Sequence, residues 1–134
     1  MVKKDKKNEK NKEINEVIHK STANNEESVE KLRENLEEIK TYEGVIGYIM
    51  RNSTSAAIDL KDPTKIIDYA ILSSSAIEVG EEIPEDFKLG TMESIIVEGK
   101  DAKILSLKID ENKTSVFMEK KIDHQKILKK LHST

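Results

Sequence analysis

Three strand-like segments follow one another in the C-terminal half of the 134-residue chain, with only a few residues between them. They are MESIIVEG (92–99), KILSLKID (103–110) and TSVFMEK (114–120), and the turns between them are polar or contain glycine. Connections this short join antiparallel neighbours, because a parallel crossover needs a dozen residues or more. The sequence therefore predicts a mainly antiparallel sheet.

Two more strands and three helices complete the expected domain. EGVIGYIMR (43–51) is apolar on both sides, as is typical of a central strand, and Gly47 in its middle leaves space for a close approach. AAIDL (56–60) follows the polar turn RNSTS as a shorter strand. Apolar spacings of three and four predict three helices, over about 25–41, 62–79 and 121–134. The predicted fold class is α+β: a mainly antiparallel five-stranded sheet with helices on both faces, in the order α-β-β-α-β-β-β-α.

The predicted helix 62–79 has two apolar stripes rather than one. The first stripe consists of Ile66, Ile67, Ala70, Ile71 and Ile77. The second stripe consists of Tyr69, Leu72, Ala76 and Val79. A narrow polar sector remains, made of Thr64, Lys65, Asp68, Ser75 and Glu78. A helix that is apolar over most of its circumference is normally buried on more than one side, whereas one small sheet covers a single side.

The ends of this helix follow from local signals. Asp62 and Pro63 predict its start, as an N-cap followed by proline at the first helical position. Gly80 is expected to end it, which makes 81–91 a connector.

Like helix 62–79, the segment 92–99 has more apolar surface than its own chain is expected to cover. Met92, Ser94 and Ile96 would lie on one side of a strand, and Ile95 and Val97 on the other. Both sides thus carry apolar groups, and a strand half-covered by its own chain need not look like this.

Composition limits the class of protein. The chain has no cysteine, so disulfides and thiolate metal sites are excluded. No apolar run approaches the ~20 residues of a membrane span, and the N-terminus lacks the apolar core of a signal peptide. We therefore expect a cytoplasmic protein without membrane insertion, whose mature chain starts at or near Met1.

The N-terminal segment is basic. Residues 1–12 carry six lysines against Asp5 and Glu9, a net charge of +4 that leaves −7 for the rest of the chain. This segment has little to bury, so we expect a flexible tail over 1–25 and one folded domain over 26–134. A basic arm can touch nucleic acid, but the folded part is acidic and has no aromatic interleaving for base stacking. A solubilising tail, with no nucleic-acid partner, is the simpler interpretation.

The sequence contains no defensible catalytic, cofactor or metal motif. The Gly-Lys pair at 99–100 is followed by Asp101, where a phosphate loop needs serine or threonine. The serines 73–75 lie mid-helix without a glycine elbow or a nearby histidine, so they are better explained as small residues for close helix packing. His124 and His132 are eight residues apart, too far along a helix to share one metal directly. We therefore expect a protein that is not an enzyme.

The element order and three segments resemble the Roadblock/dynein light-chain family, in an archaeal or bacterial version. YEGVIGYIM (42–50) is similar to the family's glycine-bearing first strand, and DPTKIIDYAILSSSAIEVGEE (62–82) is similar to its central helix. In LGTMESIIVEGKDAKILSLKID (89–110), a strand after a short glycine loop leads into a hairpin. The resemblance covers about 26–131. The turn RNSTS departs from it, because family members often have an acidic residue and a glycine there.

The resemblance implies a homodimer, or a dimer with a paralogue. The third strands of two copies would pair across a two-fold axis into one sheet, and the two copies of helix 62–79 would pack together on one face. This arrangement would bury the second apolar stripe of helix 62–79 and the apolar side chains of segment 92–99. The implied dimer interface consists of Tyr69, Leu72, Ser73, Ala76, Met92, Ser94 and Ile96.

The family's usual role is non-enzymatic: binding and regulating small Ras-like GTPases, or linking cargo to larger assemblies. The resemblance then implies a partner-binding site in the polar sector of helix 62–79, through Lys65, Asp68 and Glu78. The alternative is a profilin-like or PAS-like sensory domain that holds a small ligand between sheet and helix. Gly47 and the space it leaves are the one feature that favours this alternative.

Overall fold

The computed structural model describes residues 27–133, so the tail expected over 1–25 lies outside the described residues. The chain divides into two units, residues 1–34 and 35–134. A helix occupies residues 27–40. In its first part, Lys31 Nζ and Glu34 Oε2 form an exposed pair at 4.0 Å, one helical turn apart. The second unit contains the sheet.

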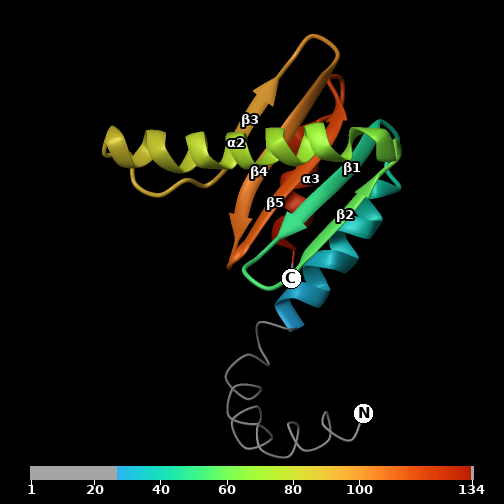
Figure 1. Ribbon diagram of the computed structural model, residues 1–134, viewed down its shortest axis with the longest axis horizontal. Helices are drawn as coiled ribbons and strands as arrows, with labels where there is room; N and C mark the ends of the chain where they lie inside the picture. Colours follow the sequence, from blue (N-terminus) through green and yellow to red (C-terminus); the bar gives the residue numbers. More distant parts are fainter. Residues whose placement is uncertain (1–26, 134) are drawn as a thin grey trace, which may run out of the picture. The chain divides into compact units, whose positions relative to one another are not determined.

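The sheet is five-stranded and antiparallel, as the sequence predicts (Figure 1). In spatial order its strands are β2 (Ala56–Leu60), β1 (Val45–Arg51), β5 (Asn112–Glu119), β4 (Ala102–Ile109) and β3 (Ile95–Glu98). With the helices included, the order along the chain is α-β-β-α-β-β-β-α, which confirms the predicted fold class. β1 lies inside the sheet, and β2 and β3 form its edges.

Helix α2 (Ile66–Asp86) crosses one face of the sheet, and α3 (His124–His132) lies on the other (Figure 1). The core beneath α2 is centred on four buried side chains: Ile49, Leu60, Ile104 and Phe117. Tyr69 of α2 stacks its ring on Phe117, with 4.5 Å between the ring centroids. Aromatic stacking at this distance adds to the stability that area burial provides.

The opposite face uses the alternate residues of the same strands, because successive side chains of a strand point to opposite sides. Leu105 and Val116 are register partners on this face, and both are fully buried. Ile127 and Leu131 of α3 are buried as well. Both faces of the inner strands are therefore apolar and covered, which explains their almost continuous apolar sequence.

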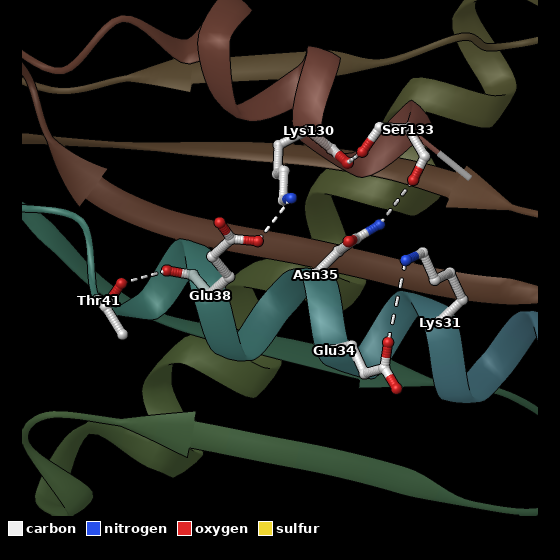
Figure 2. Close-up of polar contacts among 7 residues, drawn as sticks. All are labelled: Lys31, Glu34, Asn35, Glu38, Thr41, Lys130 and Ser133. Atoms are coloured by element: carbon white, nitrogen blue, oxygen red, sulfur yellow. Dashed lines mark hydrogen bonds and ion pairs between the residues drawn. The ribbon is translucent and has the colours of Figure 1, made fainter.

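Polar contacts join α3 to the helix that precedes β1 (Figure 2). The buried Asn35 donates from Nδ2 to the carbonyl oxygen of Ser133 at 3.0 Å. Lys130 Nζ lies 2.5 Å from a carboxylate oxygen of Glu38, and this contact raises the pKa of Lys130. Asn35 and Glu38 are one turn apart, so the same side of their helix makes both contacts.

The entry to α2 forms as predicted. The carboxylate of Asp62 accepts hydrogen bonds from the hydroxyl and the backbone N–H of Thr64, which lower the pKa of Asp62. A short 3-10 turn, η1 (Pro63–Lys65), then leads into the helix.

The predicted end of α2 is wrong. The helix continues through Gly80 and Pro84 to Asp86. Gly80 is buried, and a Cβ atom there would clash with Met92 and press on Ile95 of β3. The glycine therefore permits a close approach between α2 and β3, and is not a C-cap.

β3 is also shorter than the predicted strand 92–99. It pairs with β4 over Ile95–Glu98 only. Met92, three residues before the strand, packs against Gly80 of α2, and the pairing with β4 begins only at Ile95.

Gly47 of β1 lies against β2, with φ of 154° and a register irregularity between Val45 and Gly47. A Cβ atom at this position would clash with the carbonyl oxygen of Asp59 and with the backbone of Leu60. The chain's own β2 thus fills the space that Gly47 leaves. This glycine no longer favours a ligand between sheet and helix.

Asn52 forms the turn between β1 and β2, which contains no glycine. Its Oδ1 accepts from the backbone N–H groups of Thr54 and Ser55, each at 2.9 Å. Its Nδ2 donates to Asn112 Oδ1 at 3.0 Å. Asparagine supplies this kind of turn through its side chain, so the hairpin forms without glycine.

We expect Gly47→Ala to destabilise the protein more than the matched control Gly90→Ala. Both glycines have positive φ, where alanine costs about 1–3 kcal/mol. Nothing lies within 4 Å of a Cβ atom at Gly90, whereas at Gly47 the backbone of β2 would have to move. Thermal unfolding followed by circular dichroism should give Gly47→Ala a midpoint at least ~4 °C lower than that of Gly90→Ala. Equal midpoints would contradict the steric argument.

Candidate functional site

Large apolar side chains remain exposed along α2. Ile67 and Ile71, both members of the first predicted stripe, are 75% and 62% exposed, so this stripe is not buried as a whole. The residues of α2 that face the sheet are Ile66, Tyr69, Ala70, Ser73, Ala76, Ile77 and Gly80. The sequence indicated the excess of apolar surface correctly, but not its orientation around the helix, which the position of the sheet decides.

We call the exposed residues Leu72, Val79 and Ile83 the apolar flank of α2. They are 37%, 45% and 45% exposed, and their spacing of seven and four places them along one side of the helix. Ile83 belongs to this flank only because α2 continues beyond Gly80. The C-terminal turns of α2 extend past β3 (Figure 1), so the flank reaches beyond the edge of the sheet.

β3 is an edge strand whose outer side is open in the described part of the chain. It pairs with β4, and none of the other described strands lies beside it. Ile96 is partly buried, Val97 is exposed, and Ser94 just before the strand is also exposed. An edge with free backbone N–H and C=O groups is a template for another strand.

The residues expected at a dimer interface separate into two groups. Ser73 and Ala76 are buried against their own sheet, and Tyr69 is partly buried against the core beneath α2. Leu72 and Ser94 are exposed, whereas Met92 and Ile96 are partly buried. The apolar flank adds two exposed residues, Val79 and Ile83, to the expected helix surface, and the dimer interface itself stays a prediction.

Three buried hydroxyl groups fix α2 on the sheet. Ser73 Oγ of α2 lies 2.5 Å from Ser115 Oγ of β5, which lies 2.8 Å from Ser106 Oγ of β4. All three side chains are buried. Small polar side chains at this contact let the helix approach closely while their hydroxyls satisfy one another.

A groove of about 410 Å³ lies between α2 and the ends of β1 and β5. It is lined by Arg51, Ser74, Glu78, Glu81, Glu82, Glu85 and Lys113. Arg51 and Lys113 are register partners on adjacent strands, so they form a basic wall that faces the glutamates of α2. Among residues 27–133 no ion pair joins the two walls, and Arg51 Nε is buried without a hydrogen-bond partner. The groove therefore presents unneutralised charge of both signs.

Sequence reasoning missed this groove. Glu81 and Glu82 were expected in a connector after the helix, and Arg51 and Lys113 were given no role. The signal that could have found the acidic wall is the spacing of Glu78, Glu81 and Glu85, three and four residues apart. Nothing in the sequence brings Arg51 beside Lys113 before the strand pairing is known.

The expected partner-binding residues are all exposed but do not form one cluster. Lys65 ends the 3-10 turn, and Asp68 lies in the first turn of α2. Glu78 is the one member of this set that lines the groove.

The described residues show few features of a reactive site. Within residues 27–133, no three side chains of His, Cys, Asp or Glu are placed to hold a metal ion. His124 Nδ1 lies 3.2 Å from Lys103 Nζ, and His132 is exposed. None of the helices described is long and apolar enough to cross a membrane.

Comparison with known proteins identifies the fold. No protein-family model matches the chain, and no curated protein matches it. Among solved structures, the crystal structure of a Roadblock/LC7 domain from Streptomyces avermitilis is similar, with a TM-score of 0.58 over 69% of this chain and 81% of that one. The protein has a Roadblock/LC7 fold. The two sequences are 12% identical, so the likeness to this Roadblock/LC7 domain is one of fold.

We expect Ser115→Ala to destabilise this Roadblock/LC7 domain by about 1–3 kcal/mol, because it leaves the buried hydroxyls of Ser73 and Ser106 without a partner. The triple variant Ser73→Ala, Ser106→Ala and Ser115→Ala should recover part of this loss, since it leaves no unsatisfied hydroxyl. Urea unfolding measures both free energies. A triple variant less stable than Ser115→Ala would contradict the account.

Proposed function

We propose that the protein is a non-enzymatic, dimeric adaptor in the cytoplasm that binds and regulates a small Ras-like GTPase or helps to hold together a larger assembly. The observation that carries the proposal is the open edge of β3 combined with the apolar flank of α2. In water, an exposed apolar flank beside an open edge favours association with another chain. A protein surface can cover both features at once.

In the proposed dimer, β3 of one copy runs antiparallel to β3 of the other, and each α2 packs beside its twin. The partner copy is the same chain or a paralogue. The segment from Met92 to Ile96 then lies along the pairing edge. The C-terminal turns of α2 extend past β3 (Figure 1), and in this arrangement they reach over the added strand. Around a two-fold axis each contact occurs twice, so one substitution acts twice.

The GTPase part of the proposal rests on the Roadblock/LC7 fold and on the exposed charges of α2. Lys65, Asp68 and Glu78 remain exposed on α2 and its preceding turn, and a dimer presents each of them twice. In the proposed dimer, the two paired helices present these charges in two copies on one surface, which suits the recognition of a folded protein partner. The rival proposal of a small-ligand sensor loses its support, because β2 fills the space beside Gly47.

We expect the wild type to be a dimer and the double variant Leu72→Glu/Ser94→Lys to be a monomer, or to aggregate through its open edge. Ser94→Lys alone brings like charges together across the axis, but a cross-strand pair is worth only about 0.2–1 kcal/mol. Leu72→Glu removes up to about 1.5–3 kcal/mol of burial per side chain and places two carboxylates in an apolar contact. Size-exclusion chromatography with light scattering measures the mass.

Ile67→Glu is the matched control for this experiment. It replaces a more exposed apolar residue of the same helix with the same charge, but away from the apolar flank. The control should remain dimeric. A wild type that is monomeric at micromolar concentration, or a double variant that stays dimeric, would refute the proposed interface.

We also expect the purified protein to hydrolyse neither GTP nor ATP. The described residues offer no cluster that could hold a metal ion, and the Gly-Lys pair at 99–100 lies in an exposed β3–β4 turn without a phosphate-loop sequence. Phosphate release is measured with the wild type and with the double variant. Activity that survives repeated purification, at a constant ratio to protein, would show that the protein is an enzyme.

A further inference from the structure

One face of α2 continues from exposed apolar residues directly into the charged groove. Its members follow one another at intervals of four, three, four, three and four: Ile67, Ile71, Ser74, Glu78, Glu81 and Glu85. We call this row the grooved flank. The average spacing is 3.6 residues, the period of the α-helix, so the row stays straight along one side, and alternating steps of three and four suit the packing of a second helix.

The grooved flank is distinct from the apolar flank that the proposed dimer uses. Leu72, Val79 and Ile83 each precede a member of the grooved flank by two residues. Residues two apart on an α-helix point in nearly opposite directions, about 160° apart. A dimer formed through the apolar flank therefore leaves the grooved flank open.

The charges in the groove point to the chemistry of its occupant. Four glutamates face two basic side chains, so the groove is net acidic and favours a basic partner. Ile67 and Ile71, at the other end of the row, favour apolar side chains. Small Ser74 lies between the two ends and lines the groove without filling it.

Arg51 supplies an independent observation. Its Nε is buried and has no acceptor among the described residues, although a buried unsatisfied donor is costly. Its register neighbour across the strands is Lys113, which cannot accept a hydrogen bond. Arg51 also lines the groove, so an occupant that carries a carboxylate can offer its guanidinium group an acceptor there.

We propose that the grooved flank binds an amphipathic helix of a partner protein. That helix is apolar where it meets Ile67 and Ile71, carries lysine or arginine where it meets Glu78, Glu81 and Glu85, and brings one carboxylate to Arg51. The row from residue 67 to residue 85 is roughly 27 Å long, enough for five turns of the partner helix. This proposal rests on the adaptor function and names the partner chemistry at one of its surfaces.

Synthetic peptides test the proposal with the full-length protein. The first peptide, of about 18 residues, forms a helix with leucines at 3-4 spacing in one half, lysines at the same spacing in the other, and one glutamate beside the lysines. The second has the same composition with leucine and lysine distributed around the helix. Fluorescence anisotropy of labelled peptides gives the Kd. We expect the first peptide to bind at least about tenfold more tightly than the second.

Charge reversal on the protein locates the site. Glu81→Lys/Glu85→Lys should weaken binding of the first peptide at least about tenfold, whereas the matched control Asp101→Lys/Glu111→Lys, at exposed turn residues, should stay within about twofold. Replacing the peptide glutamate by glutamine should weaken binding to the wild type but not to Arg51→Gln. Equal binding of the two peptides, equal effects of the two double reversals, or no coupling to Arg51 would overturn the proposal.

The dimer variant separates this proposal from the adaptor dimer. If Leu72→Glu/Ser94→Lys is monomeric and still binds the first peptide like the wild type, the grooved flank acts independently, as proposed. If the wild type is itself monomeric but binds the peptide selectively, the dimer fails and the grooved flank stands. Loss of peptide binding in the Leu72→Glu/Ser94→Lys variant, with Glu81→Lys/Glu85→Lys unaffected, would assign docking to the apolar flank and overturn the proposal.

Discussion

The close contact between α2 and the sheet determines which surfaces this domain has left to offer. Ser73 reaches Ser115 at 2.5 Å, and Gly80 leaves no room for a side chain above Met92 and Ile95. Because small residues make this contact, the helix lies close to the strands and only one side of it is covered. The apolar residues on its two flanks then face solvent, although every one of them belongs to a well-packed helix.

The two exposed flanks of α2 differ in chemistry: one is apolar, and the other continues from apolar residues into a charged groove. The apolar flank and the grooved flank lie on opposite sides of α2, and the glutamates of the grooved flank line the groove at the ends of β1 and β5. In the adaptor that we propose, one surface joins two copies and the other holds a partner. Both surfaces lie on a single helix of this domain, so each can change without disturbing the core beneath.

The limits of prediction are clearest in α2. Its start was predictable, because Asp62, Pro63 and Thr64 act through local contacts. Its end was not, because Gly80 has the same identity whether it caps a helix or allows a strand to approach. The groove could not be predicted from the sequence for a related reason. Arg51 and Lys113 are far apart in the sequence and lie side by side only because β1 pairs with β5.

The sequence by itself determined the type and order of the elements, the antiparallel sheet and the surplus of apolar surface on the central helix. These follow from the period of apolar residues and from turns too short for a crossover, both of which act over a few neighbouring residues. Tertiary structure alone decided that Tyr69, Ser73 and Ala76 turn inward while Ile67, Ile71 and Leu72 turn outward. A stripe of apolar residues fixes the faces of a helix relative to one another, but only the position of the sheet decides which face is buried.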